Sequence, residues 1–130
     1  AQKSDLIVVC PATANIIAKF SNGYADDLAS TSLIAANKDI LVIPAMNTEM
    51  WNNKINKKNI SKLKNMGIEF IYPVHGRLSC GDVGIGRLAE PKKICTIISP
   101  RGPETIPIPT RLNSLSRIVF LCDSEFIRLL

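Results

Sequence analysis

Metal-binding and disulfide patterns are missing from this sequence. Its four cysteines, Cys10, Cys80, Cys95 and Cys122, stand far apart and show no CxxC spacing. Such spacing argues against a zinc site and against a disulfide framework. We therefore interpret the cysteines as reduced thiols and expect no bound metal.

Long apolar stretches are absent as well. No run of about eighteen apolar residues occurs, so a membrane span is not expected. The start of the chain also lacks the basic, apolar and small-residue order of a signal peptide. Because 46% of the 130 residues are hydrophobic, we expect one compact, soluble, cytoplasmic unit with a single core.

Aromatic residues make up only 5% of the chain, whereas basic residues give it a net charge of +5. The lysines gather on stretches typical of solvated helix faces, which include Lys54, Lys57, Lys58, Lys62, Lys64, Lys92 and Lys93. No aromatic residues or known motifs accompany them in the pattern of a nucleic-acid surface. The charge therefore does not favour nucleic-acid binding.

The alternation of short apolar runs with helix-forming segments predicts an α/β fold. Apolar runs without polar alternation, typical of strands buried on both faces, occupy residues 6–10, 40–43 and 69–72. Helices are expected over residues 14–20, 28–36, 59–66 and 91–98. This order predicts a parallel sheet covered by helices.

Turn and cap signals support these boundaries. Thr13 or Asn15 can cap the first helix, Asp26 or Asp27 the second, and Gly67 suits a left-handed position after the third. Residues 73–90 are rich in glycine and proline and predict a long functional loop. After residue 98 the prolines predict an extended, irregular tail over 99–130.

Two candidate motifs follow directly after predicted strands, where parallel sheets bind their ligands. Residues 11–15, Pro-Ala-Thr-Ala-Asn, offer small side chains and a helix N-terminus to a phosphate or planar ligand. Taken alone, this motif is better explained by an ordinary strand-to-helix turn with Thr13 or Asn15 as the capping residue. Residues 44–51, Pro-Ala-Met-Asn-Thr-Glu-Met-Trp, combine an amide with apolar walls, or else place Met46, Met50 and Trp51 in the core with Asn47 as a cap.

The third motif, residues 76–88, carries four glycines around Cys80 and could close over a ligand and present a thiol. A small surface cysteine in a flexible loop is the alternative. His75, the sole histidine, precedes this loop. A Cys80–His75 nucleophilic pair is disfavoured, because sequence neighbours seldom face one another and no third orienting group is evident.

Taken together, the three motifs resemble the flavin-dependent cysteine decarboxylases, and within them the phosphopantothenoylcysteine decarboxylases of coenzyme A biosynthesis. The family patterns Pro-x-Met-Asn-x-x-Met-Trp and Cys-Gly-Asp-x-Gly-x-Gly-Arg match residues 44–51 and 80–87 at every fixed position. The resemblance covers residues 1–98 and implies a Rossmann- or flavodoxin-like sheet that lacks its N-terminal part, followed by a tail at 99–130.

The resemblance also implies roles for individual residues. The residues expected to line the cofactor FMN are Ala12, Thr13, Ala14, Asn15 and Ala45. Asn47 and Met50 would hold the cysteinyl carboxylate end of the substrate, and Cys80 would supply a proton from a mobile flap.

The implied reaction is FMN-dependent decarboxylation of phosphopantothenoylcysteine to phosphopantetheine by a homo-oligomer built from trimers. Peptidyl-cysteine decarboxylases, which do not need the flap cysteine, are an alternative, and flavin prenyltransferases rank third. The family's Gly-rich FMN-phosphate loop and catalytic histidine are not found in this sequence, and His75 does not occupy that histidine's place. An inactive fragment or a non-catalytic flavoprotein-like subunit is therefore the competing hypothesis.

Overall fold

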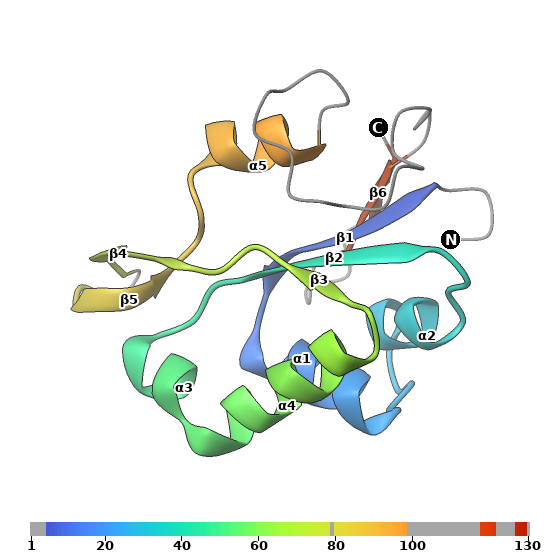
Figure 1. Cartoon of the computed structure of the whole chain (residues 1–130), viewed down its shortest axis with the longest axis horizontal. Helices are drawn as coiled ribbons and strands as arrows, with labels where there is room; N and C mark the ends of the chain where they lie inside the picture. Colours follow the sequence, from blue (N-terminus) through green and yellow to red (C-terminus); the bar gives the residue numbers. More distant parts are fainter. Residues whose placement is uncertain (1–4, 79, 99–117, 122–126, 130) are drawn as a thin grey trace.

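The computed structural model describes residues 5–78, 80–98, 118–121 and 127–129, arranged as a sheet with helices on both sides (Figure 1). A five-stranded sheet has the order β3-β2-β1-β6-β7, and a separate two-stranded sheet pairs β4 with β5. The five strands of the larger sheet are β1 (Leu6–Ala12), β2 (Asp39–Pro44), β3 (Glu69–Phe70), β6 (Ile118–Leu121) and β7 (Ile127–Leu129). Among the described strands of this larger sheet, β7 pairs antiparallel with β6 and the other pairs are parallel.

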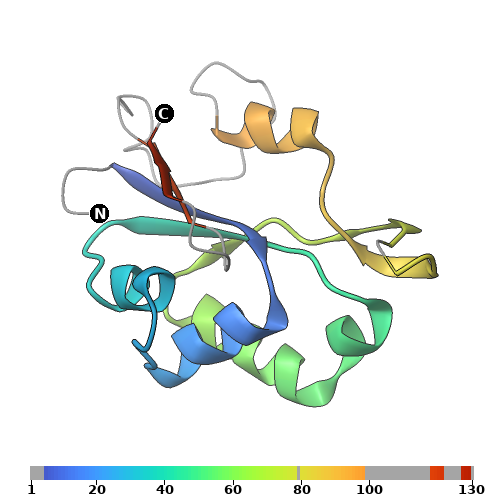
Figure 2. The ribbon, with the colours of Figure 1, turned by 180° about the vertical axis from the view of Figure 1, so that it is seen from behind.

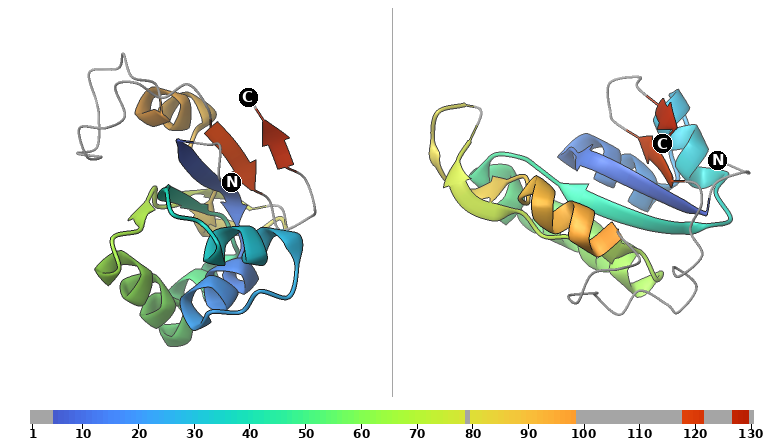
Figure 3. Two further views of the ribbon diagram at one scale, coloured as in Figure 1. Left: turned by 90° about the vertical axis from the view of Figure 1, so that its right-hand side faces the viewer. Right: turned by 90° about the horizontal axis from the view of Figure 1, so that it is seen from above.

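Helices connect these strands and flank the sheet. They are α1 (Ala14–Asn22), α2 (Leu28–Ile34), α3 (Thr48–Asn52), α4 (Lys54–Asn65) and α5 (Pro91–Ile98). The end-on view in Figure 3 shows α5 on one face of the sheet and α1, α2 and α4 on the other. The predicted parallel sheet with flanking helices is confirmed.

Both faces of β1 are buried, which explains why its sequence shows no polar alternation. Ile7 and Val9 belong to a cluster with residues of α1, α2 and α4. Leu6 and Val8 belong to a second cluster with Ile94 of α5 and neighbouring residues. Successive side chains of a strand point to opposite faces, so an apolar residue at every position serves two cores.

Helix caps follow the sequence signals closely. The Thr13 hydroxyl accepts a hydrogen bond from the Ile16 N–H, and the Asp27 carboxylate accepts one from the Ser30 N–H in a capping box. Gly67 takes a positive φ of 89° directly after α4, as predicted. A residue without a Cβ adopts this left-handed conformation at little cost.

Several boundaries differ from the sequence-based expectations. The predicted helix over 59–66 begins earlier, at Lys54, where the Asn53 side chain accepts a hydrogen bond from the Ile55 N–H. The predicted loop over 73–90 contains a hairpin of β4 (Val74–Arg77) and β5 (Val83–Arg87). Glycine-rich strands carry little strand propensity, so this hairpin was missed.

The tail beyond residue 98 was expected to be irregular, yet two short pieces of it are strands. β6 pairs parallel with β1, with Leu6 opposite Ile118 and Val9 opposite Leu121. Val119 and Leu121 are buried against the same helices as Ile7. The predicted proline stretch at 100–109 lies outside the described residues, and the domain boundary at residue 98 stays a prediction.

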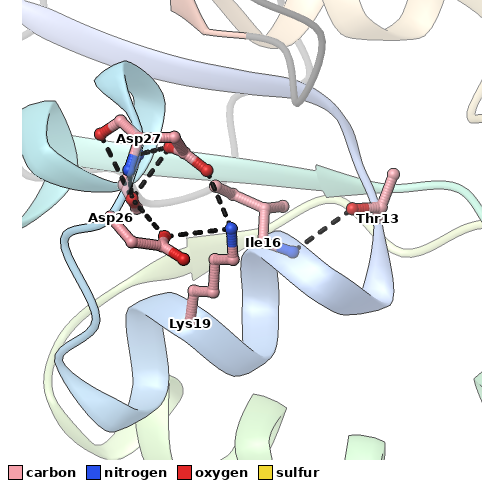
Figure 4. A network of polar contacts seen from close by, with 6 residues as sticks. Thr13, Ile16, Lys19, Asp26 and Asp27 are labelled. Atoms are coloured by element: carbon pink, nitrogen blue, oxygen red, sulfur yellow. Dashed lines mark hydrogen bonds and ion pairs between the residues drawn. The ribbon is translucent and has the colours of Figure 1, made fainter.

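An ion-pair network ties α1 to the start of α2 (Figure 4). The Lys19 Nζ lies 2.9 Å from an Asp27 carboxylate oxygen and 3.0 Å from one of Asp26. Hydrogen bonding from Lys19, followed by hydrogen bonds from Ser30, lowers the pKa of Asp27 from 3.8 to about 2. The same partners, Asp27 first and then Asp26, raise the pKa of Lys19.

The Leu63→Ala substitution tests the core under the sheet. Leu63 has no exposed surface, so truncation should lower the free energy of unfolding by about 2–5 kcal/mol. Lys62→Ala on the exposed face of α4 is the matched control and should change it by less than about 0.5 kcal/mol. Urea unfolding of both variants measures the difference, and equal stabilities would contradict this packing.

Acid titration tests the Asp27 network. A carboxylate whose folded pKa is lowered stabilises the fold above its ordinary pKa and loses that contribution as the pH falls. Unfolding free energy should therefore decline between about pH 3.8 and about pH 2. Asp27→Asn keeps a capping oxygen but no charge, and Lys19→Gln removes the partner, so both should show a smaller decline in denaturant unfolding. Identical pH profiles would disprove this assignment.

Candidate functional site

The turns that follow β1 and β2 lie side by side at one edge of the sheet. In the parallel pairing of the two strands Ala12 stands opposite Pro44. The Ala45 N–H donates a hydrogen bond of 3.1 Å to the Ala12 carbonyl. The first two sequence motifs therefore meet, as expected for the carboxyl ends of neighbouring parallel strands.

The turn after β1 is a capped helix start. Thr13 caps α1 through its hydroxyl, with 3.2 Å between Oγ1 and the Ile16 nitrogen. Ala12 is fully buried, Ala14 is half-buried and Asn15 is exposed. The capping interpretation of Thr13 is confirmed. Asn15 lies in the first turn of α1, where backbone N–H groups lack partners within the helix.

The turn after β2 confirms the cap and the buried tryptophan of the core-and-cap interpretation of its motif, but does not bury Met50. Asn47 caps α3, because its Oδ1 accepts a hydrogen bond of 2.8 Å from the Met50 N–H. Trp51 is a buried core residue, whereas Met50 keeps 43% of its surface exposed. The cap fixes the orientation of the Asn47 amide and leaves its NH2 half to donate.

The β4–β5 hairpin carries Cys80 on its connecting turn. Figures 1 and 2 show this hairpin above α3, beyond the end of the large sheet. The Leu78 N–H donates to the Asp82 carbonyl at 2.8 Å and closes the turn. Cys80 is exposed, and its Sγ lies 3.7 Å from an Asp82 carboxylate oxygen.

The hairpin is attached to the turn after β2 by two hydrogen bonds. The Met46 N–H donates to the Gly86 carbonyl at 2.9 Å. The Thr48 hydroxyl donates to the Ile85 carbonyl at 2.8 Å. The second and third sequence motifs are thereby joined, and the residues bonded through the Thr48 hydroxyl stand 37 positions apart along the chain.

These segments enclose a pocket of about 520 Å³. The residues that line it are Pro11, Ala45, Met46, Asn47, Arg77, Leu78, Cys80, Gly86, Arg87 and Leu88. Three predicted site residues, Ala45, Asn47 and Cys80, thus face one cavity. Ala12, Thr13, Ala14, Asn15 and Met50 are not among the lining residues. The assigned roles of all eight remain predictions.

Sequence reasoning overlooked the two arginines of the pocket. Arg77 and Arg87 are both exposed, and an Arg87 nitrogen lies 3.9 Å from a Glu90 carboxylate oxygen. The glycines predict a loop over residues 73–90, and a predicted loop does not indicate which way Arg77 and Arg87 face. The two arginines stand at opposite ends of the hairpin, where Arg87 pairs with Val74 and Arg77 with Val83, and both line the pocket.

The pocket suits a flavin in size and surface. Its volume lies within the range of about 300–1,000 Å³ typical of ligand sites. Pro11, Leu78 and Leu88 supply apolar wall, and Asn47 supplies a polar group. Asn15 is exposed in the first turn of α1, whose backbone N–H groups can donate to an anion.

Three further features concern His75, a metal site and a membrane-spanning helix. His75 pairs with Ile85 in the hairpin and does not line the pocket, so a Cys80–His75 pair gains no support. Among the described residues, no three His, Cys, Asp or Glu side chains gather as a metal site would require. No helix in this part of the chain is long and apolar enough to cross a membrane.

Comparison with curated proteins identifies relatives of known activity. The coenzyme A biosynthesis bifunctional protein CoaBC of Bacillus subtilis (strain 168) is 45% identical over 106 residues. This match covers 82% of the chain but only 26% of that protein. The chain therefore spans about a quarter of the length of such relatives.

Solved structures give a consistent result. A Cys-to-Ser mutant of PPC decarboxylase complexed with pantothenoylaminoethenethiol is 39% identical, with a TM-score of 0.67 over 69% of this chain and 50% of that one. The FMN binding protein AtHal3 is 40% identical, with a TM-score of 0.62 and the same coverage of 69% and 50%. Both confirm the predicted fold, and the first also confirms the resemblance to cysteine decarboxylases.

The family model described as Flavoprotein matches residues 1–101, which is most of the chain. It includes the turns after β1 and β2, the hairpin and α5. On this evidence the chain belongs to the Flavoprotein family.

Proposed function

We propose that this chain forms the substrate side of an FMN-dependent decarboxylase that converts phosphopantothenoylcysteine to phosphopantetheine. The observation that carries the proposal is the pocket in which Asn47, Ala45 and Cys80 face one cavity. The similarity to CoaBC and to PPC decarboxylase supports the same reaction. When bound, FMN would supply the two-electron redox chemistry that cysteine decarboxylation requires.

Asn47 would orient the substrate carboxylate. Its Oδ1 is engaged by the Met50 N–H, so the NH2 half is the part that can donate to an anion. Leu78 and Leu88 line the same pocket and would exclude water from the reacting end. Exclusion of water strengthens each polar contact inside the site.

Cys80 would donate the proton to the enethiol formed by loss of carbon dioxide. It lies on the hairpin turn and lines the pocket together with Asn47. A thiol suits this role because it can exchange a proton near neutral pH. Cys80 favours this reaction over peptidyl-cysteine decarboxylation, which stops at the enethiol.

Arg77 and Arg87 give the pocket a positive lining that suits an anionic substrate. A phosphorylated cysteinyl compound carries both a carboxylate and a phosphate. A C-terminal peptidyl cysteine carries only the carboxylate, so the two arginines of the pocket suit the more anionic phosphorylated substrate better.

The competing proposal is a non-catalytic flavoprotein-like subunit. In this sequence neither the family's FMN-phosphate loop nor its catalytic histidine is found. In the decarboxylase proposal another polypeptide segment supplies both, within a cytoplasmic assembly built from trimers. No nucleic-acid or membrane partner is part of the proposal.

An FMN-binding assay tests whether the chain has a cofactor site, which both proposals require. The purified chain should quench flavin fluorescence with micromolar affinity, because the turns after β1 and β2 are already joined. Asn15→Ala should abolish this binding, since it removes a donor at the start of α1. Lys62→Ala, remote on α4, is the control. Absence of binding by the parent chain would disprove a self-contained flavin site.

The Asn47→Asp substitution tests recognition of the carboxylate. Aspartate preserves the cap of α3 but replaces the donating NH2 with a negative charge. We expect unchanged FMN binding and a loss of about 10- to 100-fold in kcat/KM. Carbon dioxide release is measured with the chain mixed with a polypeptide that contains the N-terminal half of a CoaBC relative. Unchanged kcat/KM would exclude this role for Asn47, and an inactive parent mixture would favour the non-catalytic subunit.

A further inference from the structure

In the part of the chain that the structure describes, two hydrogen bonds join the hairpin to the turn after β2. β4 and β5 form a sheet of their own and share no ladder with the larger sheet. The turn after β2 holds β5 through the Met46–Gly86 main-chain bond and the Thr48–Ile85 bond. Of these two, only the second involves a side chain and can be removed by substitution without altering the backbone.

Gly84 and Gly86 lie so close to the turn after β2 that no larger residue would fit at either position. A Cβ added to Gly86 would lie 2.0 Å from the Met46 carbonyl oxygen, and one added to Gly84 would lie 2.2 Å from the Thr48 Oγ1. Real Cβ atoms essentially never come so near, so only glycine permits this packing. Both glycines are buried although they belong to the otherwise open hairpin.

Thr48 is adjacent in sequence to Asn47, which caps α3. Its hydroxyl binds the Ile85 carbonyl, two positions from the Arg87 that lines the pocket. The bond therefore fixes the separation between the turn that carries Asn47 and the hairpin that carries Cys80. Loss of a donor to a half-buried carbonyl weakens such an attachment.

We propose that Thr48 is a positioning residue whose hydroxyl latches the Cys80 hairpin onto the turn that carries Asn47. The latch closes the pocket on the side of β5 and holds Cys80 at the distance from which its thiol reaches the ligand. Its catalytic consequence rests on the decarboxylase function proposed above, whereas the latch itself is a property of the chain alone.

The test compares Thr48→Val with Thr48→Ser. Valine keeps the branched shape and lacks the hydroxyl, whereas serine keeps the hydroxyl. Trypsin can cut after Arg77 and Arg87 when the hairpin detaches, and cleavage of a transiently opened segment follows the population of the open form. We expect Thr48→Val to be cut there about five- to tenfold faster than the parent chain, from loss of one hydrogen bond. Thr48→Ser should be cut at nearly the parental rate.

Cleavage after Lys62 within α4 reports general loosening of the fold and should be equal in all three proteins. Gly84→Ala is a second variant, because its added Cβ would displace the Thr48 side chain. It should speed cleavage after Arg77 and Arg87 as Thr48→Val does. Parental cleavage rates in Thr48→Val, or equally fast cleavage in Thr48→Ser, would overturn the latch.

The catalytic consequence has its own readout. In the active mixture Thr48→Val should lower kcat at least fivefold with little change in KM and should release more unreduced enethiol, because proton delivery by Cys80 is impaired. Serine should restore the parental product ratio. If cleavage responds to the hydroxyl while the parent mixture shows no decarboxylation, the latch stands and the proposed function fails. If cleavage does not respond, the latch fails whatever the activity.

Discussion

The parallel pairing of β1 with β2 is the constraint on which the candidate site depends. It sets Ala12 opposite Pro44 and allows the Ala45 N–H to reach the Ala12 carbonyl. Burial of β1 on both faces fixes this register, because a shift by one residue would exchange the side chains of the two cores. The hydrophobic effect in the sheet thereby determines where the polar groups of the site stand.

The second constraint is the fit of a glycine-rich strand against a helix start. Gly84 and Gly86 have no side chains where Thr48 and Met46 approach, so the hairpin can rest on the turn after β2. The pocket exists because of this contact, since its lining comes from both sides of it. The glycine-rich hairpin therefore packs closely against the turn after β2.

Much of this arrangement could be predicted from the sequence. Apolar runs located β1 and β2, and capping residues such as Thr13 and Asp27 located the helix starts, because these signals are local. Ala45, Met46 and Asn47 of the motif at residues 44–51 line one pocket with Cys80. The specific roles assigned to the site residues have not been tested by the structure.

The remainder depends on contacts between distant segments. The hairpin strands carry glycine where strand propensity would favour branched residues, and their pairing is visible only in three dimensions. Arg77 and Arg87 enter the pocket only because that hairpin forms. The strand β6 does coincide with an apolar run at residues 118–121, but its place beside β1 depends on burial of Val119 and Leu121 against distant helices.

The central claim is that the turns after β1 and β2 and the Cys80 hairpin form one ligand site. Backbone and side-chain amide NMR shifts, recorded while FMN and then phosphopantothenoylcysteine are added, test it most directly. We predict that FMN shifts the signals of Asn15 and Ala45, and that the substrate then shifts those of Asn47, Cys80 and Gly86. Shifts confined to surfaces away from these three segments, such as the exposed face of α4 or α5, would contradict the account.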